Sequence, residues 1–120
     1  AKAPGLIARA QEIASGEGIA VDNIGVYMQP VIQGTACHCQ LDLFADPDEI
    51  AGMEPAYRKI SQAINDLGGY FSRPYGCWGE IVYPHCDTFV KYARGLKRIF
   101  DPDLILNPEK VCFKEMDNES

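Results

Sequence analysis

No apolar run in the sequence approaches the roughly 20 residues that a membrane-spanning helix needs, and no basic segment followed by an apolar one resembles a signal peptide. Basic residues are also scarce, because 11 Lys and Arg stand against 17 Asp and Glu, a formal net charge of -6. A nucleic-acid backbone is therefore excluded as the main partner, since phosphate binding needs an excess of cations. We expect a cytoplasmic protein with no membrane partner and no nucleic-acid partner.

The cysteines lack both the pattern of a secreted disulfide framework and that of a metal site. Their number, five, is odd, and no two are spaced as C-x-x-C. Cys37 and Cys39 share one face of a predicted strand, whereas His38 points to the other face, so four ligands do not converge. We predict free thiols and no metal. A small metal-binding protein that uses these side chains stays open as an alternative, which elemental analysis would test.

Length and composition indicate a single soluble domain. The 120 residues suffice for one hydrophobic core, and 47% hydrophobic with 23% charged residues is ordinary for a globular protein. We predict one domain over residues 1–120. The chain starts at Ala1 rather than Met, so we expect that something upstream is missing.

Hydrophobic periodicity predicts an α+β fold, an antiparallel sheet with helices packed on one face. Predicted helices cover residues 4–14, a segment that Asp46 or Asp48 caps and that runs to about Leu67, and a segment from Asp87 to Phe100. Predicted strands cover residues 21–32 and 35–44, with shorter ones near 70–72 and 81–83. The last helix is predicted to bury Phe89, Ala93, Leu96 and Phe100, and to expose a solvated basic face of Lys91, Arg94, Lys97 and Arg98.

Two polar clusters are candidate functional sites. One face of the strand at 35–44 carries His38, Gln40 and Asp42, and it meets solvent, a partner or a ligand. The segment from Tyr70 to Gly76 holds an arginine between tyrosines, which can present a guanidinium and two phenols to a carboxylate or a phenolate. Each cluster also has a plainer interpretation, a solvated sheet face and a packed aromatic turn with a surface arginine.

Residues 100–113, FDPDLILNPEKVCF, stand out near the end of the chain. This segment is too short for a helix between its Asp-Pro and Asn-Pro turns, and it is too apolar for a free tail. We therefore predict that it is a strap that docks on another structure.

The strap and the helix before it carry a family resemblance. LKRIFDPDLILNPEKV resembles the C-terminal signature of FAD-linked oxidases of the vanillyl-alcohol oxidase / p-cresol methylhydroxylase type, in which a helix leads into a D-P-x-x-I-L-N-P-G-K-like strap; Glu109 stands where glycine is usual. GTACHCQLDLFADPDE resembles the family's histidine-bearing strand, with His38 as the match. LGGYFSRPYG resembles the glycine-led turn where members place active-site residues. The resemblance covers most of residues 24–113.

The resemblance implies that the chain is the C-terminal part of a cap domain, a ferredoxin-like half that covers the flavin and shapes the substrate pocket. No Gly-rich flavin-binding segment occurs in the sequence, so it implies an FAD-binding domain or subunit outside this chain, on which the strap docks. The isolated chain would then be inactive. The implied catalytic residues are Arg73 as the charge partner of a phenolate, Tyr75 and Tyr70 as hydrogen-bond donors, and His38. The implied FAD-binding residues are Asn107 and Lys110.

Two differences from the family's lactate and glycolate motif indicate which substrate class the resemblance favours. The lactate and glycolate branch usually carries G-E-H-G-I-G. In this chain Pro74 stands in place of the glutamate of that motif, and Tyr75 stands in place of its histidine. The resemblance thus favours hydride transfer from a phenolic or hydroxylated substrate, with a 2-hydroxy acid dehydrogenase cap as the alternative. A different alternative is a non-catalytic α+β module that binds a small anion or a protein. A homo-oligomer is compatible with each of these.

Overall fold

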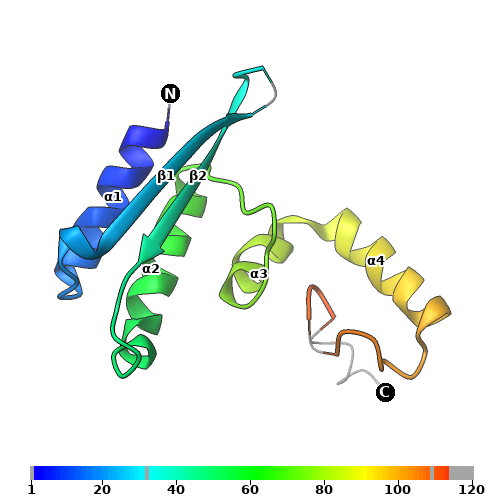
Figure 1. Cartoon of the computed structure of the whole chain (residues 1–120). Helices are drawn as coiled ribbons and strands as arrows, with labels where there is room; N and C mark the ends of the chain where they lie inside the picture. The colour runs from blue at the N-terminus through cyan, green and yellow to red at the C-terminus, as the bar shows by residue number, and fades with distance from the viewer. Residues whose placement is uncertain (1, 32, 109, 114–120) are drawn as a thin grey trace. The chain divides into compact units, whose positions relative to one another are not determined.

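The computed structural model describes residues 2–31, 33–108 and 110–113. It divides into two compact units, Ala1–Gly69 and Tyr70–Ser120, and we describe each unit by itself (Figure 1). The predicted strand end at residue 32 and the departure at Glu109 lie outside the described residues. The organisation as one domain stays a prediction.

The described residues form an α+β fold with a two-stranded antiparallel sheet, as the sequence predicted. The helices are α1 (Ala3–Gly16), α2 (Glu54–Asp66), α3 (Cys77–Val82) and α4 (Asp87–Phe100). The strands are β1 (Ile24–Val31) and β2 (Ala36–Leu43). Short 3-10 turns occupy Val21–Asn23, Ile50–Met53 and Tyr83–His85.

In the first unit, α1 and α2 pack together on one face of the β1–β2 hairpin (Figure 1). The core joins Ala10 and Ala14 of α1 to Ile24 of β1 and Ile60 of α2. The two alanines are four residues apart, so they lie on the same side of α1, and their small side chains let the helix approach its neighbours closely. Leu41 and Leu43 of β2 pack against this core as well.

The register of the hairpin decides which backbone groups point outward. Ile24 lies opposite Leu43. The residues next to them, Asn23 and Phe44, are joined by a hydrogen bond from the Phe44 N–H to the Asn23 carbonyl at 2.8 Å, so Ile24 and Leu43 form a non-hydrogen-bonded pair. Every second residue of β1 from Ile24 to Pro30 therefore turns its backbone away from β2. Proline has no N–H, and it is tolerated at this outward position because the ladder loses no hydrogen bond.

The start of the second helix differs from the prediction. Neither Asp46 nor Asp48 caps it; a 3-10 turn comes first, and α2 begins at Glu54 with Pro55 in its first turn. A helix that started at Asp48 would have placed Pro55 in its interior, where proline removes a hydrogen bond and clashes with the preceding turn. The signal for the correct start was therefore Pro55 rather than the aspartates.

The two short strands predicted near 70–72 and 81–83 are wrong, because residues 70–76 form bends and turns and α3 occupies Cys77–Val82. Gly76 precedes this helix with a φ of 56°, a left-handed value that favours glycine. Ile81 suggested a strand because it is β-branched, but it is buried as part of the helix.

The predicted inner stripe of the last helix is also wrong in the described structure. Phe89, Leu96 and Phe100 are 55%, 56% and 79% exposed, whereas Lys97, assigned to the solvated face, is only 8% exposed. Lys97 is tolerated inside because its ammonium is paired with Asp101, which is 5% exposed. The buried face of α4 is therefore the one that carries the Lys97–Asp101 ion pair, and not the apolar face that the sequence pattern predicted.

Gly95 offers a test of how firmly α4 is formed. It lies in the helix interior with ordinary helical φ, and a Cβ there would meet nothing within 4 Å. Gly95→Ala should therefore raise the free energy of unfolding by about 0.4–1 kcal/mol, because alanine restricts the unfolded chain and favours helix. Chemical denaturation would measure it. A loss of stability in this variant would contradict a helical Gly95.

Candidate functional site

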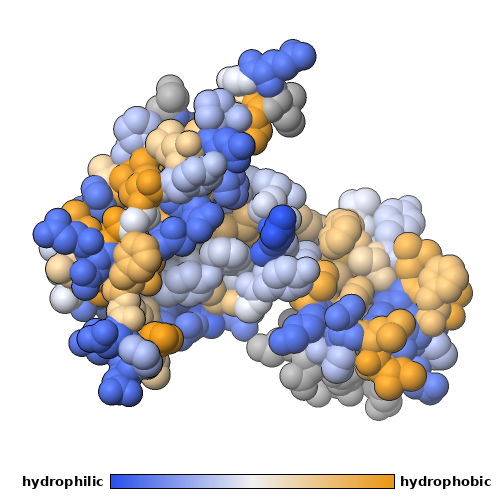
Figure 2. All heavy atoms as spheres, viewed as in Figure 1, coloured by the Kyte–Doolittle hydropathy of each residue, from blue (hydrophilic) through white to orange (hydrophobic). Residues whose placement is uncertain are grey.

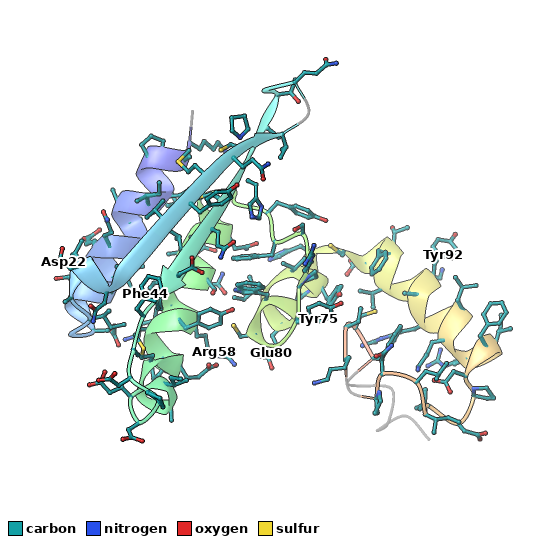
Figure 3. All side chains as sticks on the ribbon, viewed as in Figure 1. Asp22, Phe44, Arg58, Tyr75, Glu80 and Tyr92 are labelled. Carbon is teal, nitrogen blue, oxygen red and sulfur yellow. The ribbon has the colours of Figure 1, made fainter. Side chains whose placement is uncertain are left out.

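Three residues that the resemblance singled out lie around one hollow of the second unit. This hollow, of about 340 Å³, is lined by Tyr75, Gly76, Asn107, Lys110 and Val111. Tyr75, which Figure 3 labels, comes from the turn before α3, and the other two predicted residues come from the strap. The fold brings a phenol, an amide and an ammonium together across more than 30 residues of sequence.

Arg73 and Tyr70 belong to the same turn but do not line the hollow. Both are exposed, Tyr70 to 83%, and the Arg73 carbonyl accepts a hydrogen bond from the Tyr75 N–H at 2.9 Å. The turn is supported by Phe71, whose ring stacks on Trp78 of α3 at a centroid distance of 4.9 Å. An arginine and two tyrosines are therefore presented outward from a turn that an aromatic contact holds.

Tyr83 is a residue near this turn that sequence reasoning missed. Burial raises the pKa of its phenol, with smaller contributions from Cys112, Tyr75, Cys86 and Tyr70. Its hydroxyl is therefore protonated at neutral pH and able to donate a hydrogen bond. The incorrect strand prediction for 81–83 concealed it, because the 3-10 turn after α3 gives its side chain a different direction.

His38 lies in the first unit, on the sheet face opposite the helices. It pairs with Gln29 of β1, and its side chain is exposed. The Gln40 amide on the same face donates to the Asp42 carboxylate at 2.8 Å, so the predicted polar face exists as a hydrogen-bonded surface. Because His38 and the hollow are in different units, the catalytic role of His38 stays a prediction.

The strap is held at the end of α4 by two side chains of that helix, Arg94 and Lys97, and by its own Asp101; we call these three side chains the strap anchors. The Lys97 ammonium donates to the Asp101 carboxylate and to the Leu106 carbonyl. Asp101 accepts hydrogen bonds from the backbone N–H groups of Ile105 at 3.0 Å and Leu106 at 2.9 Å. The Arg94 Nε donates to the carbonyl of Cys112 at 2.9 Å. Part of the strap therefore docks inside this chain, through its backbone.

The apolar side chains of α4 and the strap form a hydrophobic surface on the second unit, and Figure 2 shows orange residues gathered there. Figure 3 shows Tyr92 projecting from α4, and this residue is 67% exposed. The members of the surface are Phe89, Tyr92, Leu96, Ile99, Phe100, Ile105 and Leu106. Exposed apolar patches of this kind mark sites where another protein surface docks.

The thiols do not form a reactive cluster. Burial raises the pKa of Cys112 and, together with the neighbouring Cys37, that of Cys39. Both thiols therefore stay protonated at neutral pH, and the thiolate is the form that binds metals or attacks substrates. Over residues 2–31, 33–108 and 110–113, no group of three or more His, Cys, Asp or Glu side chains could hold a metal ion.

A second hollow, also of about 340 Å³, lies in the first unit where β2 leads into α2. Its lining is mostly apolar and comprises Leu43, Ala45, Ile50, Met53, Glu54 and Tyr57. Two of these residues, Ile50 and Met53, come from the 3-10 turn that replaces the predicted first turn of the helix.

The donor set around the first hollow fits part of an FAD molecule or a small substrate. A volume of 340 Å³ is at the lower end of the range of roughly 300–1,000 Å³ for ligand pockets, so a whole dinucleotide would not be enclosed. Lys110 and Asn107 supply N–H donors that suit anionic oxygens such as those of a phosphate or a flavin carbonyl. These donors therefore suit an anionic group or one edge of a flavin ring rather than a whole FAD molecule.

None of the described helices is both long enough and apolar enough to cross a bilayer.

Comparisons of the chain with family models, with curated proteins and with solved structures gave no match.

Proposed function

We propose that this chain is the C-terminal cap segment of an FAD-dependent oxidoreductase that transfers a hydride from a phenolic or hydroxylated substrate to the flavin. The observation that carries the proposal is the hollow at which Tyr75 meets Asn107 and Lys110. Asn107 and Lys110 are close in sequence, and Tyr75 comes from a turn more than 30 residues earlier. The resemblance implies a substrate role for Tyr75 and a cofactor role for Asn107 and Lys110, so a shared hollow supports the proposal.

The chemistry of the turn suits a phenolic substrate. FAD, when bound, accepts the hydride. Ionisation of the phenol makes hydride loss easier, but a phenolate taken out of water is costly unless its charge is paired. Arg73 supplies a permanent positive charge, and Tyr75 and Tyr70 supply O–H donors on the same turn. Donors fixed before the reaction stabilise developing charge without reorganisation.

The exposed hydrophobic surface supports a partner that carries the flavin. Phe100, Ile105 and Leu106 are 79%, 74% and 63% exposed, and all three belong to the strap. Because the strap anchors bond to backbone groups, these exposed side chains are available to another domain or subunit. Burial of such side chains contributes about 1.5–3 kcal/mol each.

The test is made on the longest natural form of the protein. Its absorbance spectrum should show flavin bands, and para-alkylphenols should bleach them under anaerobic conditions. Arg73→Ala should slow this flavin reduction on the order of 100-fold or more, the loss typical of one missing charge-stabilising donor. Arg9→Ala, which removes an exposed arginine that pairs with Glu12 on α1, is the matched control and should leave the rate unchanged.

Two results would decide against the proposal or its substrate. A colourless natural form that binds no added FAD would rule out the flavoenzyme and leave a non-catalytic binding module. Bleaching by lactate or glycolate but not by phenols would move the function to the 2-hydroxy acid branch.

A further inference from the structure

The strap residues that line the hollow lie between two backbone carbonyls that accept hydrogen bonds from α4, and we call these two carbonyls the fixed points. Leu106 is held at its carbonyl by Lys97, and Cys112 is held at its carbonyl by Arg94. Between them, Asn107, Lys110 and Val111 line the hollow. The donors to both fixed points come from α4, since Arg94 and Lys97 lie one turn apart on that helix. The position of the strap residues that line the hollow therefore depends on α4, because α4 carries both hydrogen-bond donors.

Local turns and positive φ values occur together around this segment: the Lys110 N–H donates to the Asn107 carbonyl at 3.2 Å, and the Phe113 N–H donates to the Lys110 carbonyl at 3.0 Å. Asn107 has a φ of 50° and Val111 a φ of 58°, in the left-handed region that costs a β-branched residue most. Leu104, just before the first fixed point, has a φ of 53°. Such values persist only where the surroundings impose them. Two of the strap anchors, Lys97 and Arg94, hydrogen-bond the backbone at Leu106 and at Cys112, on either side of Asn107 and Val111.

The Lys97–Asp101 pair has the features of a rigid support rather than of a surface ion pair. Both side chains are less than 10% exposed, and the ammonium also lies 5.1 Å from the ring centroid of Phe113. The carboxylate accepts three donors, the Lys97 ammonium and two strap N–H groups. Removal of either partner leaves a buried group unsatisfied and frees Leu106.

We propose that Lys97 and Asp101 are positioning residues, which set the strap side of the Tyr75–Asn107–Lys110 hollow so that a bound flavin and substrate meet in reacting geometry. This inference rests on the proposed function and deepens it. Neither residue lines the hollow, and each acts through the backbone of residues 105 and 106. A displacement of about 1 Å in such a segment can cost on the order of 100-fold in rate.

The experiment uses the flavin-loaded natural form and a para-alkylphenol as the probe, with anaerobic single-turnover kinetics. Lys97→Met and, as the nearly isosteric second variant, Asp101→Asn should each lower the rate of flavin reduction on the order of 100-fold with little change in the phenol dissociation constant. Lys97→Arg, which keeps the charge, should restore most of the rate. Lys91→Met, an exposed lysine on the same helix, is the control and should behave as wild type.

The failures are distinguishable. Wild-type protein that shows no flavin reduction overturns the proposed function. Active wild type with unchanged reduction rates in both Lys97→Met and Asp101→Asn overturns the positioning role alone. So does a loss that Lys97→Arg does not restore, or one that appears only as weaker phenol binding, since neither reports on reacting geometry.

Discussion

Replacement of Ile60 by alanine should lower the free energy of unfolding of the first unit by about 2–5 kcal/mol, the range observed when a large aliphatic side chain is truncated in a core. Ile60 is 6% exposed and belongs to the cluster that joins α1, α2 and β1. Ile60 and Ile24 are the two large side chains among the four buried members of the cluster, so truncation of Ile60 removes much of its buried volume. Urea denaturation followed by circular dichroism would measure the loss.

The control for this prediction is Ile50→Ala in the same unit. Ile50 is 61% exposed, so its truncation should change stability by no more than about 0.5 kcal/mol. Because the chain has two compact units, the signal should be followed at first-unit residues, where a separate transition would be visible. Equal losses in the two variants would contradict the core described here.

Acidification should release the strap from α4. The hydrogen bond from Lys97 lowers the pKa of Asp101 and is the largest effect; burial opposes it, and the backbone N–H groups of Leu106 and Ile105 lower the pKa further. A carboxyl group whose folded pKa is lowered contributes stability above its unfolded pKa, here near 3.8, and loses that contribution as pH falls through the folded pKa. The protection factors of the Ile105 and Leu106 amides, which are exchange rates corrected for their intrinsic pH dependence, should therefore fall only below about pH 3.8.

Asp101→Asn should abolish this acid transition, because an amide has no proton to gain in that range. Its amide exchange at Ile105 and Leu106 should be fast already at neutral pH, since the charge that held these N–H groups is gone. Asp103→Asn, a change at an exposed carboxylate two residues along the strap, should keep the wild-type transition. An acid transition of the same midpoint in Asp101→Asn would show that another group is responsible.

Sequence periodicity predicted the parts of the fold in which local pattern and tertiary packing agree. Ala10 and Ala14 repeat at helical spacing and are buried, and Leu41 and Leu43 alternate along β2 and pack on the same core. The hairpin needs no distant partner for its register, because a short connection links its strands. These elements were therefore predictable from the chain alone.

The second unit was harder to predict because long-range polar contacts decide its structure. The inward turn of Lys97 requires Asp101 and the carbonyl of Leu106, nine residues away, and no pattern of apolar residues contains that information. Likewise, α3 depends on the left-handed Gly76 that precedes it rather than on its strand-favouring Ile81. A helix-turn spacing of four residues between Lys97 and Asp101 was the one available signal.

Some residues of the candidate site could be predicted from the sequence, and others could not. Asn107 and Lys110 could be singled out because the strap motif resembles a known signature, and Tyr75 because it follows Arg73-Pro74 in a glycine-led turn. That these three residues line one hollow required the structure. Tyr83 could not be found, since its proximity to the other tyrosines arises from the helical path of α3.

The outer edge of β2 has a practical consequence for anyone who prepares this chain. By the register of the hairpin, Cys37, Cys39, Leu41 and Leu43 direct their backbone N–H and C=O groups away from β1, and no described residue pairs with them. This edge carries no proline, lysine or bulge, the usual protection against strand-to-strand association. Preparations of the separate chain should therefore form intermolecular β-structure as protein concentration rises, and refolding at high dilution or with a competing peptide strand would preserve the monomer.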